Sequence, residues 1–273
     1  MLRDHLDAIR QRIQQACQRS GRDSSSVTLV CVTKGIPLEV IQQAIRLGVT
    51  DIGENRVQEV RAKRIALGFK LQASSSKPQA TGSPEPAASS LQPAACSVQP
   101  VRWHLIGHLQ RNKVKDAVEL FDVIHSIDSH ALIQELERHM AKKTRPIDVF
   151  VQVNVSGEPT KFGCRPEEAG SLAQTIVASP HLRLRGLMTI APFSEDAETA
   201  RPVFRQLRAL RDQLLLPLRS LSPVTGRLSL QLSMGMSHDF EVAIEEGADV
   251  VRLGTAIFGT GDKRQETGAG THG

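Results

Sequence analysis

The sequence contains no tyrosine, and aromatic residues make up only 3% of its 273 positions. A reaction that requires a tyrosine phenol as its acid or base is therefore excluded. Four cysteines are present, which are Cys17, Cys31, Cys96 and Cys164. They lie far apart and lack the C-x-x-C spacing that is typical of zinc and redox sites, so we expect reduced thiols and no metal site.

Long apolar runs are also missing, since none approaches the ~20 residues that a membrane-spanning helix requires. The first ten residues, "MLRDHLDAIR", alternate charged with apolar side chains and do not resemble a signal peptide. The net charge is +5, but basic residues are mixed with acidic ones, and no run of five like charges occurs. We therefore expect a cytoplasmic protein that binds neither a membrane nor nucleic acid.

Apolar residues recur every three or four positions at the start of the chain, which predicts an amphipathic helix before the first strand. Strand-like and helix-like segments alternate after it. The predicted strands are residues 27–33, 49–53, 102–107, 121–127, 147–155, 182–190, 227–233 and 249–254. The predicted helices include residues 37–47, 108–119, 129–142, 166–178, 195–216 and 239–247.

Most of these eight strands are apolar on both faces, as is typical of a parallel sheet that helices cover. Eight such units predict an α/β protein with a (β/α)8 TIM barrel, a single domain and an extra N-terminal helix. An open doubly wound sheet is the alternative fold. No G-x-G-x-x-G turn follows the first strand, which argues against the dinucleotide-binding form of that alternative.

Residues 70–100 interrupt the alternation with a segment made mainly of Ser, Pro, Ala and Gln. Such a segment buries too little apolar surface to offset the entropy of ordering, so we expect a disordered insertion. A lid or a partner-docking arm is the alternative. We also expect a disordered tail at residues 260–273. The predicted barrel domain therefore covers residues 1–259, interrupted by the insertion.

Lys34 ends the first apolar strand, in the stretch "LVCVTKGIP" of residues 29–37. The active site of a TIM barrel lies at the carboxyl ends of its strands, so this lysine belongs to the active face. Its amine either reaches water or lies in a pocket. A pocket would lower the pKa of the lysine and make its neutral amine a nucleophile towards carbonyl groups.

The turns after the seventh and eighth strands form a second candidate site, within "SMGMSHDFEVAIEEGADVVRLGTAIFG" of residues 233–259. Gly254 allows close approach of a ligand, Thr255 offers an amide and a hydroxyl, and Ser237 offers further donors. TIM barrels commonly bind phosphate after these two strands. The structural alternative makes Gly254 a turn residue and Ser237 a helix cap. A reactive lysine together with a phosphate site points to pyridoxal 5′-phosphate.

Several stretches carry a resemblance to a known family. They are "VTKGIP", "GENRVQE", "WHLIGHLQRNK", "NVSGEPTKFGC", "LRGLMTI", "LSMGMSHDFEVAI" and "VVRLGTAIFG". Their order and sequence resemble the pyridoxal phosphate homeostasis protein family, whose barrel is similar to the N-terminal domain of alanine racemase. The resemblance covers almost the whole chain outside residues 70–100 and the tail, and the insertion departs from the family pattern.

The resemblance implies that Lys34 forms a Schiff base with pyridoxal 5′-phosphate. It also implies that Ser237, Gly254 and Thr255 hold the phosphate and that Arg252 faces the pyridine nitrogen. Since an arginine only donates hydrogen bonds, that nitrogen would stay unprotonated and would be a weak electron sink.

Other polar residues near the predicted strand ends are weaker candidates. Asn55 matches the family stretch "GENR", and its carboxamide either caps the following helix or orients the cofactor. His104 and His108 straddle a strand end and a loop, which argues against a metal pair, although His104 is a candidate for a place over the cofactor. Lys161 either exchanges the cofactor with Lys34 or is a solvated surface charge. The set also includes Ser126, Asn154 and Ser233, for which caps and loop contacts are usual.

Catalysis is disfavoured by the same resemblance. Alanine racemases use a tyrosine from a second domain, whereas this chain has no tyrosine and we expect no second domain after residue 259. The expected function is therefore a non-catalytic role in pyridoxal phosphate homeostasis, by a monomer that stores the cofactor reversibly and supplies apo-enzymes. The alternatives are a fold-type III enzyme, racemase-like and acting on small amino acids, and an aldolase that uses Lys34 without a cofactor.

Overall fold

The computed structural model describes residues 1–68, 101–221 and 228–259. Eight parallel strands close into a barrel in chain order, and the last strand pairs with the first. The strands are β1 (Thr28–Val32), β2 (Asp51–Glu54), β3 (Arg102–Leu105), β4 (Val123–Ile127), β5 (Ile147–Gln152), β6 (Leu182–Met188), β7 (Gln231–Ser233) and β8 (Val250–Leu253). The predicted single-domain (β/α)8 barrel is confirmed. The insertion predicted at 70–100 and the tail predicted at 260–273 lie outside the described residues.

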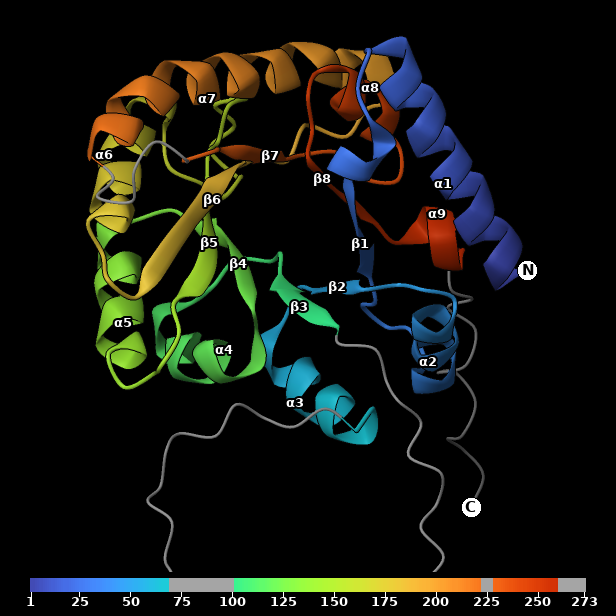
Figure 1. The fold of residues 1–273 in the computed structure, drawn as a ribbon, viewed down its shortest axis with the longest axis horizontal. Coiled ribbons are helices and arrows are strands. Elements are labelled where there is room, and N and C mark those ends of the chain that lie inside the picture. Colours follow the sequence, from blue (N-terminus) through green and yellow to red (C-terminus); the bar gives the residue numbers. More distant parts are fainter. Residues whose placement is uncertain (69–100, 222–227, 260–273) are drawn as a thin grey trace, which may run out of the picture.

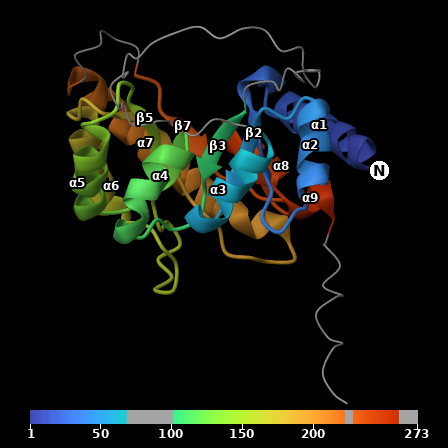
Figure 2. The same ribbon diagram turned by 90° about the horizontal axis from the view of Figure 1, so that it is seen from below.

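Helices surround the barrel in chain order, as Figure 1 shows. They are α1 (Leu2–Arg19), α2 (Leu38–Arg46), α3 (Val57–Ala66), α4 (Val114–Leu120), α5 (His130–Met140), α6 (Pro166–Val177), α7 (Arg201–Leu221), α8 (Phe240–Glu245) and α9 (Thr255–Phe258). The predicted N-terminal helix is α1, which packs on α8 and α9 (Figure 2). The buried apolar side chains of α1 cover this side of the barrel, because α9 has only four residues and is too short to do so. Among the described helices, none is both long and apolar enough to cross a membrane.

Two predicted helices have different limits in the structure. α4 begins at Val114 rather than at position 108, because a 3-10 turn at Arg111–Lys113 precedes it. α7 begins at Arg201, after another 3-10 turn at Ala197–Ala200, and it runs to Leu221. Both regions are helical, but their first turns are too tight to continue an α-helix.

Helix α3 lies after β2, where the sequence predicted a helix without giving its limits. Its buried positions are Val57, Val60 and Arg64, so an arginine takes the place of an apolar residue in the inward stripe. The apolar periodicity is therefore too short to indicate a helix by itself.

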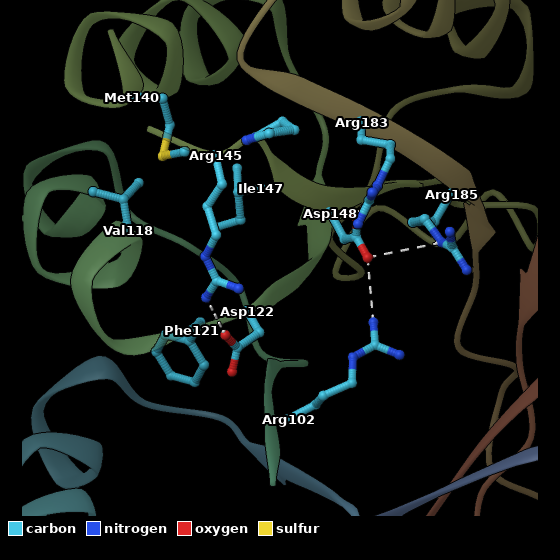
Figure 3. A pocket seen from close by; sticks show the side chains of 11 residues that line it. Arg102, Val118, Phe121, Asp122, Met140, Arg145, Ile147, Asp148, Arg183 and Arg185 are labelled. Carbon is cyan, nitrogen blue, oxygen red and sulfur yellow. Dashed lines mark hydrogen bonds and ion pairs between the residues drawn. The ribbon is translucent and has the colours of Figure 1, made fainter. Parts of the chain in front are cut away.

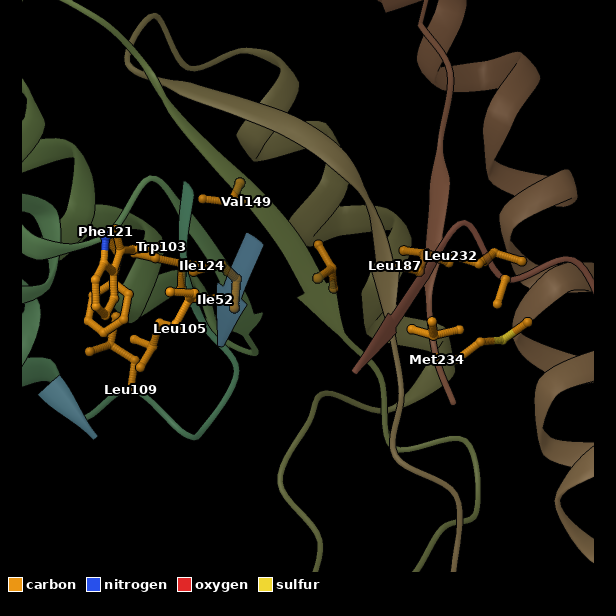
Figure 4. Close-up of a cluster of buried hydrophobic side chains, with 14 of the residues drawn as sticks. Ile52, Trp103, Leu105, Leu109, Phe121, Ile124, Val149, Leu187, Leu232 and Met234 are labelled. Atoms are coloured by element: carbon orange, nitrogen blue, oxygen red, sulfur yellow. The ribbon is translucent and has the colours of Figure 1, made fainter. Parts of the chain in front are cut away.

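The larger apolar core lies between the strands and the helices, and Trp103, Leu105 and Phe121 are fully buried in it (Figure 4). A smaller cluster fills part of the barrel interior. Its members are Val30, Val123, Phe150, Met188 and Val250. Polar side chains occupy neighbouring inward positions, because His125 lies two residues after Val123 and Arg252 lies two residues after Val250. The barrel interior is thus only partly apolar.

Candidate functional site

The carboxyl ends of β1 and β8 lie side by side, because Cys31 pairs with Leu253 in the barrel. Lys34 lies in a turn just after β1, and Gly254 directly follows β8. A Cβ atom built on Gly254 would lie 3.4 Å from Val32 Cβ, so the two strand ends are in van der Waals contact. The structure therefore brings the turn of Lys34 next to the predicted phosphate-binding turn.

The Lys34 side chain is exposed rather than enclosed. Gly35, which follows it, has a φ of +70°, a conformation that glycine adopts at little cost. The turn thus presents the amine to solvent at the mouth of the barrel. In this structure the amine of Lys34 therefore reaches water. The alternative, in which it lies in a closed pocket, is wrong.

The residue before Lys34 is held by a buried polar cluster. Thr33 is 1% exposed, and its hydroxyl donates to Glu54 Oε1 over 2.6 Å. Lys63 Nζ donates to the same Oε1 over 2.6 Å and to the Thr33 carbonyl over 2.8 Å. Neither Glu54 nor Lys63 was predicted from the sequence, although a carboxylate at the end of an apolar strand is an available signal. The cluster connects β1, β2 and α3 directly beneath the turn of Lys34.

Ser237 joins the turns that follow β7 and β8. Its Oγ accepts hydrogen bonds from the amides of Gly254 and Ala256, each over 3.2 Å. Ser237 does not cap the next helix, α8, whose N-cap is Asp239, but its Oγ accepts from amides at the start of α9 as a helix cap would. Thr255, the first residue of α9, is exposed beside these amides. Two amides that converge on one oxygen atom form the kind of donor arrangement that a phosphate oxygen requires.

Arg252 lies inside the barrel and is 4% exposed. Its Nη1 donates to Ser233 Oγ over 2.6 Å, and its Nη2 donates to the Thr189 carbonyl over 2.9 Å. Burial lowers the pKa of Arg252 to about 10, although the charge of Asp239 opposes the shift, so the guanidinium keeps its charge at neutral pH. Among the described residues, none accepts a hydrogen bond from Arg252 Nε. That N–H group is therefore available to a ligand.

A cavity of about 580 Å³ opens on the same face beside Asn55. Residues from the loops after β2, β3 and β5 line it, among them His108 and Phe162. Asn55 does not cap α3, because the N-cap is Arg56 and no side-chain cap bond is present there. The remaining alternative, contact between Asn55 and a cofactor, stays a prediction. Lys34 is not among the residues that line this cavity.

The two histidines near the end of β3 do not act together. His104 points into the barrel, is 2% exposed and contacts two buried polar side chains, so its predicted place over a cofactor is wrong. The His108 ring instead stacks on Phe162 with centroids 4.0 Å apart, and its Nδ1 lies 3.4 Å from Asp128 Oδ2. Within the described parts of the chain, no group of three or more metal-ligating side chains is assembled.

The loop after β5 holds two further candidates. Asn154 organises this loop, because its Nδ2 donates to the Glu158 carbonyl over 2.8 Å. Lys161 Nζ lies 3.2 Å from Glu158 Oε1, and the Lys161 side chain is only 23% exposed. The interpretation of Lys161 as a solvated charge is therefore wrong, whereas its exchange with Lys34 stays a prediction. Ser126 is buried within β4 and does not reach the active face.

Arginines gather at the opposite end of the barrel, around a cavity of about 300 Å³ (Figure 3). The Asp148 carboxylate forms ion pairs with Arg102, Arg183 and Arg185. Arg145 donates to Asp122 over 2.8 Å. This end carries the amino ends of the strands and the carboxyl ends of the helices, where positive side chains balance the helix dipoles. We interpret the cluster as structural, because TIM barrels carry their chemistry at the other end.

Comparisons with known proteins agree with this fold and show the family of the chain. Residues 5–262 match the family model described as alanine racemase, N-terminal domain. A curated relative from Aquifex aeolicus (strain VF5) is named pyridoxal phosphate homeostasis protein. It is 39% identical over 256 residues, which cover 94% of this chain and 96% of the relative.

Two solved structures share both the fold and appreciable sequence identity. The first is PipY of Synechococcus elongatus PCC7942 with PLP bound, at 30% identity and a TM-score of 0.72, covering 95% of this chain and 100% of PipY. The second is an unknown protein from Bifidobacterium adolescentis, at 36% identity and a TM-score of 0.75, covering 94% of each chain. The similarity therefore extends over the complete barrel.

Proposed function

Since the chain belongs to the pyridoxal phosphate homeostasis protein family, we propose that it binds pyridoxal 5′-phosphate and helps to control the cellular level of this cofactor. One observation carries the proposal most directly. The exposed amine of Lys34 and the convergent amides of Gly254 and Ala256 come from adjacent strand ends. The bound cofactor in PipY gives the proposal a structural precedent.

The residues at this face fit the groups of pyridoxal 5′-phosphate. The cofactor supplies an aldehyde that reacts with primary amines, and Lys34 offers such an amine. Ser237, Gly254 and Thr255 offer hydroxyl and amide donors to a phosphate. The Gly254 and Ala256 amides both donate to Ser237 Oγ, so the hydroxyl and these amides lie together at the barrel mouth. Asn55 completes the proposed set by orienting the cofactor from the end of β2.

Arg252 has a proposed electronic role. Its guanidinium stays charged at neutral pH, since burial lowers its pKa only to about 10. It can therefore only donate to the pyridine nitrogen, which remains an unprotonated acceptor. A ring in this state withdraws electrons weakly, and most amino-acid chemistry of the cofactor is disfavoured. This is the physical argument for a binding function without sustained catalysis.

The exposure of Lys34 also favours exchange over catalysis. A cofactor held at an open strand end can be released, whereas efficient catalysis requires a site that excludes water. The proposal therefore includes apo-enzymes that depend on pyridoxal 5′-phosphate as recipients, a monomeric barrel domain at residues 1–259 and a cytoplasmic location. The expectation of reduced cysteines supports that location.

Absorbance and peptide mapping test the proposal. Wild-type protein mixed with pyridoxal 5′-phosphate should become yellow, and borohydride should attach the cofactor to the peptide that contains Lys34. The Lys34→Ala variant should lose this attachment. Lys142→Ala is a matched control, because Lys142 is also exposed but follows α5 at the opposite end of the barrel. Attachment elsewhere, or equal attachment in Lys34→Ala, would refute the assignment.

A racemase-like enzyme that acts on small amino acids is the alternative. The match to the N-terminal domain of alanine racemase favours it. It requires turnover near ordinary enzyme rates of ~1–1000 s⁻¹ when the loaded protein is given a panel of amino acids. The carrier proposal predicts rates far below that range in the same assay.

A further inference from the structure

Five buried polar side chains form a continuous row of hydrogen bonds inside the barrel. Arg252 Nη1 lies 2.6 Å from Ser233 Oγ, which lies 2.9 Å from His125 Nδ1. His125 Nε2 lies 2.9 Å from His104 Nδ1, and His104 Nε2 lies 2.8 Å from Asp51 Oδ1. Each of these residues is at most 7% exposed. The row runs from the proposed cofactor-facing arginine to the start of β2, at the opposite end of the barrel.

The arginine end of the row fixes the direction of these bonds. A guanidinium has no acceptor, so Arg252 must donate to Ser233 Oγ. Among the described residues, His125 Nδ1 is the acceptor within reach of the buried Ser233 hydroxyl. That hydroxyl therefore donates to His125, whose proton must lie on Nε2.

The aspartate end requires the same direction. Burial raises the pKa of Asp51, but hydrogen bonds from His104 and Thr50 outweigh it, and the net shift is downward. The ionised carboxylate only accepts, so His104 Nε2 carries a proton and donates. Burial lowers the pKa of both histidines, which keeps them neutral and leaves His104 Nδ1 free to accept from His125. The arginine end and the aspartate end therefore require the same tautomer, with the proton on Nε2, for both histidines.

We propose that this hydrogen-bond chain positions the Arg252 guanidinium from the far side of the barrel. The positioning residues are Asp51, His104, His125 and Ser233. Asp51 fixes the tautomer of His104 and, through it, that of His125. His125 Nδ1 then accepts the Ser233 proton, which points away from Arg252. Ser233 Oγ then presents only lone pairs to the guanidinium. The inference deepens the proposed function, because it rests on the contact between Arg252 and the cofactor.

Nuclear magnetic resonance of ¹⁵N-histidine in the cofactor-free protein tests the polarity directly. Signals are assigned with His104→Asn and His125→Asn. Both wild-type histidines should be neutral with the proton on Nε2. A proton on Nδ1 of either ring, or a charged imidazole at neutral pH, would overturn the inference.

Asp51→Ala tests the link to Arg252. It should abolish the single histidine tautomer, change the Arg252 Nε resonance and weaken cofactor binding on the order of tenfold. Glu246→Ala is the matched control, because Glu246 is a buried carboxylate shortly before β8 that pairs with arginines outside the hydrogen-bond chain. It should leave the tautomers and the Arg252 signal unchanged. Unchanged tautomers or an unchanged Arg252 signal in Asp51→Ala would refute the positioning role.

Ser233→Ala and Ser233→Thr give a second route if Asp51→Ala does not fold. The alanine variant should weaken cofactor binding, and threonine should restore it because it keeps the hydroxyl. Equal binding by both variants would contradict the inference. If wild-type protein binds no cofactor while its histidines and Arg252 behave as expected, the proposed function fails and the hydrogen-bond chain stands.

Discussion

The Thr33 hydroxyl donates to the Glu54 carboxylate over 2.6 Å, so the residue before Lys34 is bonded to the end of the neighbouring strand. Glu54 is fully buried, and its charge is balanced by Lys63, whose side chain is 14% exposed. A buried carboxylate without a partner would be costly, which makes this pair a requirement for the local structure. The exposed Lys34 therefore follows a residue that is buried and hydrogen-bonded.

Breaking the Glu54–Lys63 pair should destabilise the protein strongly. Glu54→Leu leaves the ammonium of Lys63 without its partner and should lower the free energy of unfolding by about 3 kcal/mol. The double variant Glu54→Leu/Lys63→Leu removes both charges and should regain most of that loss. Urea denaturation of Glu54→Leu, Lys63→Leu and the double variant measures the coupling. A double variant as unstable as Glu54→Leu would show that the charge pair is not the cause.

Acid should destabilise the protein through its buried histidines. Burial lowers the pKa of His104 and, more strongly, of His125 below the ordinary value of 6.5. Below pH 6.5 the unfolded chain binds protons that the folded barrel does not, so stability is complete above this pH and falls as the pH decreases. Each histidine contributes a slope of up to about 1.4 kcal/mol per pH unit.

Urea unfolding between about pH 5 and pH 8 measures this slope. His125→Phe removes one of the two groups and should make the curve flatter. His130→Gln is the control, because His130 is exposed and should leave the slope as it is in the wild type. An unfolding free energy that does not change over this range would mean that the buried histidines bind protons in the folded state.

The barrel could be predicted from the sequence because every strand has a local signal. Strands β1, β5 and β8 are mainly apolar runs, and the lysine, serine and arginine of the proposed site stand near strand ends. The limits of α4 and α7 could not be predicted, since a 3-10 turn and an α-turn have the same apolar pattern over three residues. The limits of α3 could not be predicted, because Arg64 occupies an inward position and shortens the apolar pattern.

The interior polar chain could not be predicted because its members are distant in sequence. His125 and Ser233 are 108 positions apart, and only closure of the barrel brings them together. His104 was singled out as a strand-end residue, but the register of β3 turns its side chain into the barrel beside Gly53 of β2. Sequence periodicity indicates which face a residue occupies, and it does not indicate which distant side chain meets it there.

The three described cysteines should resist alkylation in the folded protein. Burial raises the pKa of Cys31 and of Cys164 to about 12 and also raises that of Cys17, so almost no thiolate is present at neutral pH. Iodoacetamide followed by peptide mass spectrometry should find these residues unmodified in buffer and fully modified in urea. Rapid labelling of Cys31 in buffer would mean that the seam between β1 and the helices opens readily.

Ser237 should distinguish a phosphorylated from an unphosphorylated ligand. Ser237→Ala removes a hydroxyl donor and the oxygen that orders the Gly254 and Ala256 amides, so affinity for pyridoxal 5′-phosphate should fall about tenfold. Affinity for pyridoxal, which lacks the phosphate, should change little. Absorbance titrations with both ligands measure the difference, and the exposed neighbour His238, replaced by Gln, is the control.

The comparison between the two ligands separates a local effect from a general one. If Ser237→Ala weakened both ligands equally, the variant would have disturbed the barrel mouth as a whole, and Ser237 would not belong to a phosphate site. If it weakened neither, the amides of Gly254 and Ala256 would be sufficient without the hydroxyl. Only a selective loss of the phosphorylated ligand is consistent with a phosphate site at Ser237, because the phosphate is the one group by which the ligands differ.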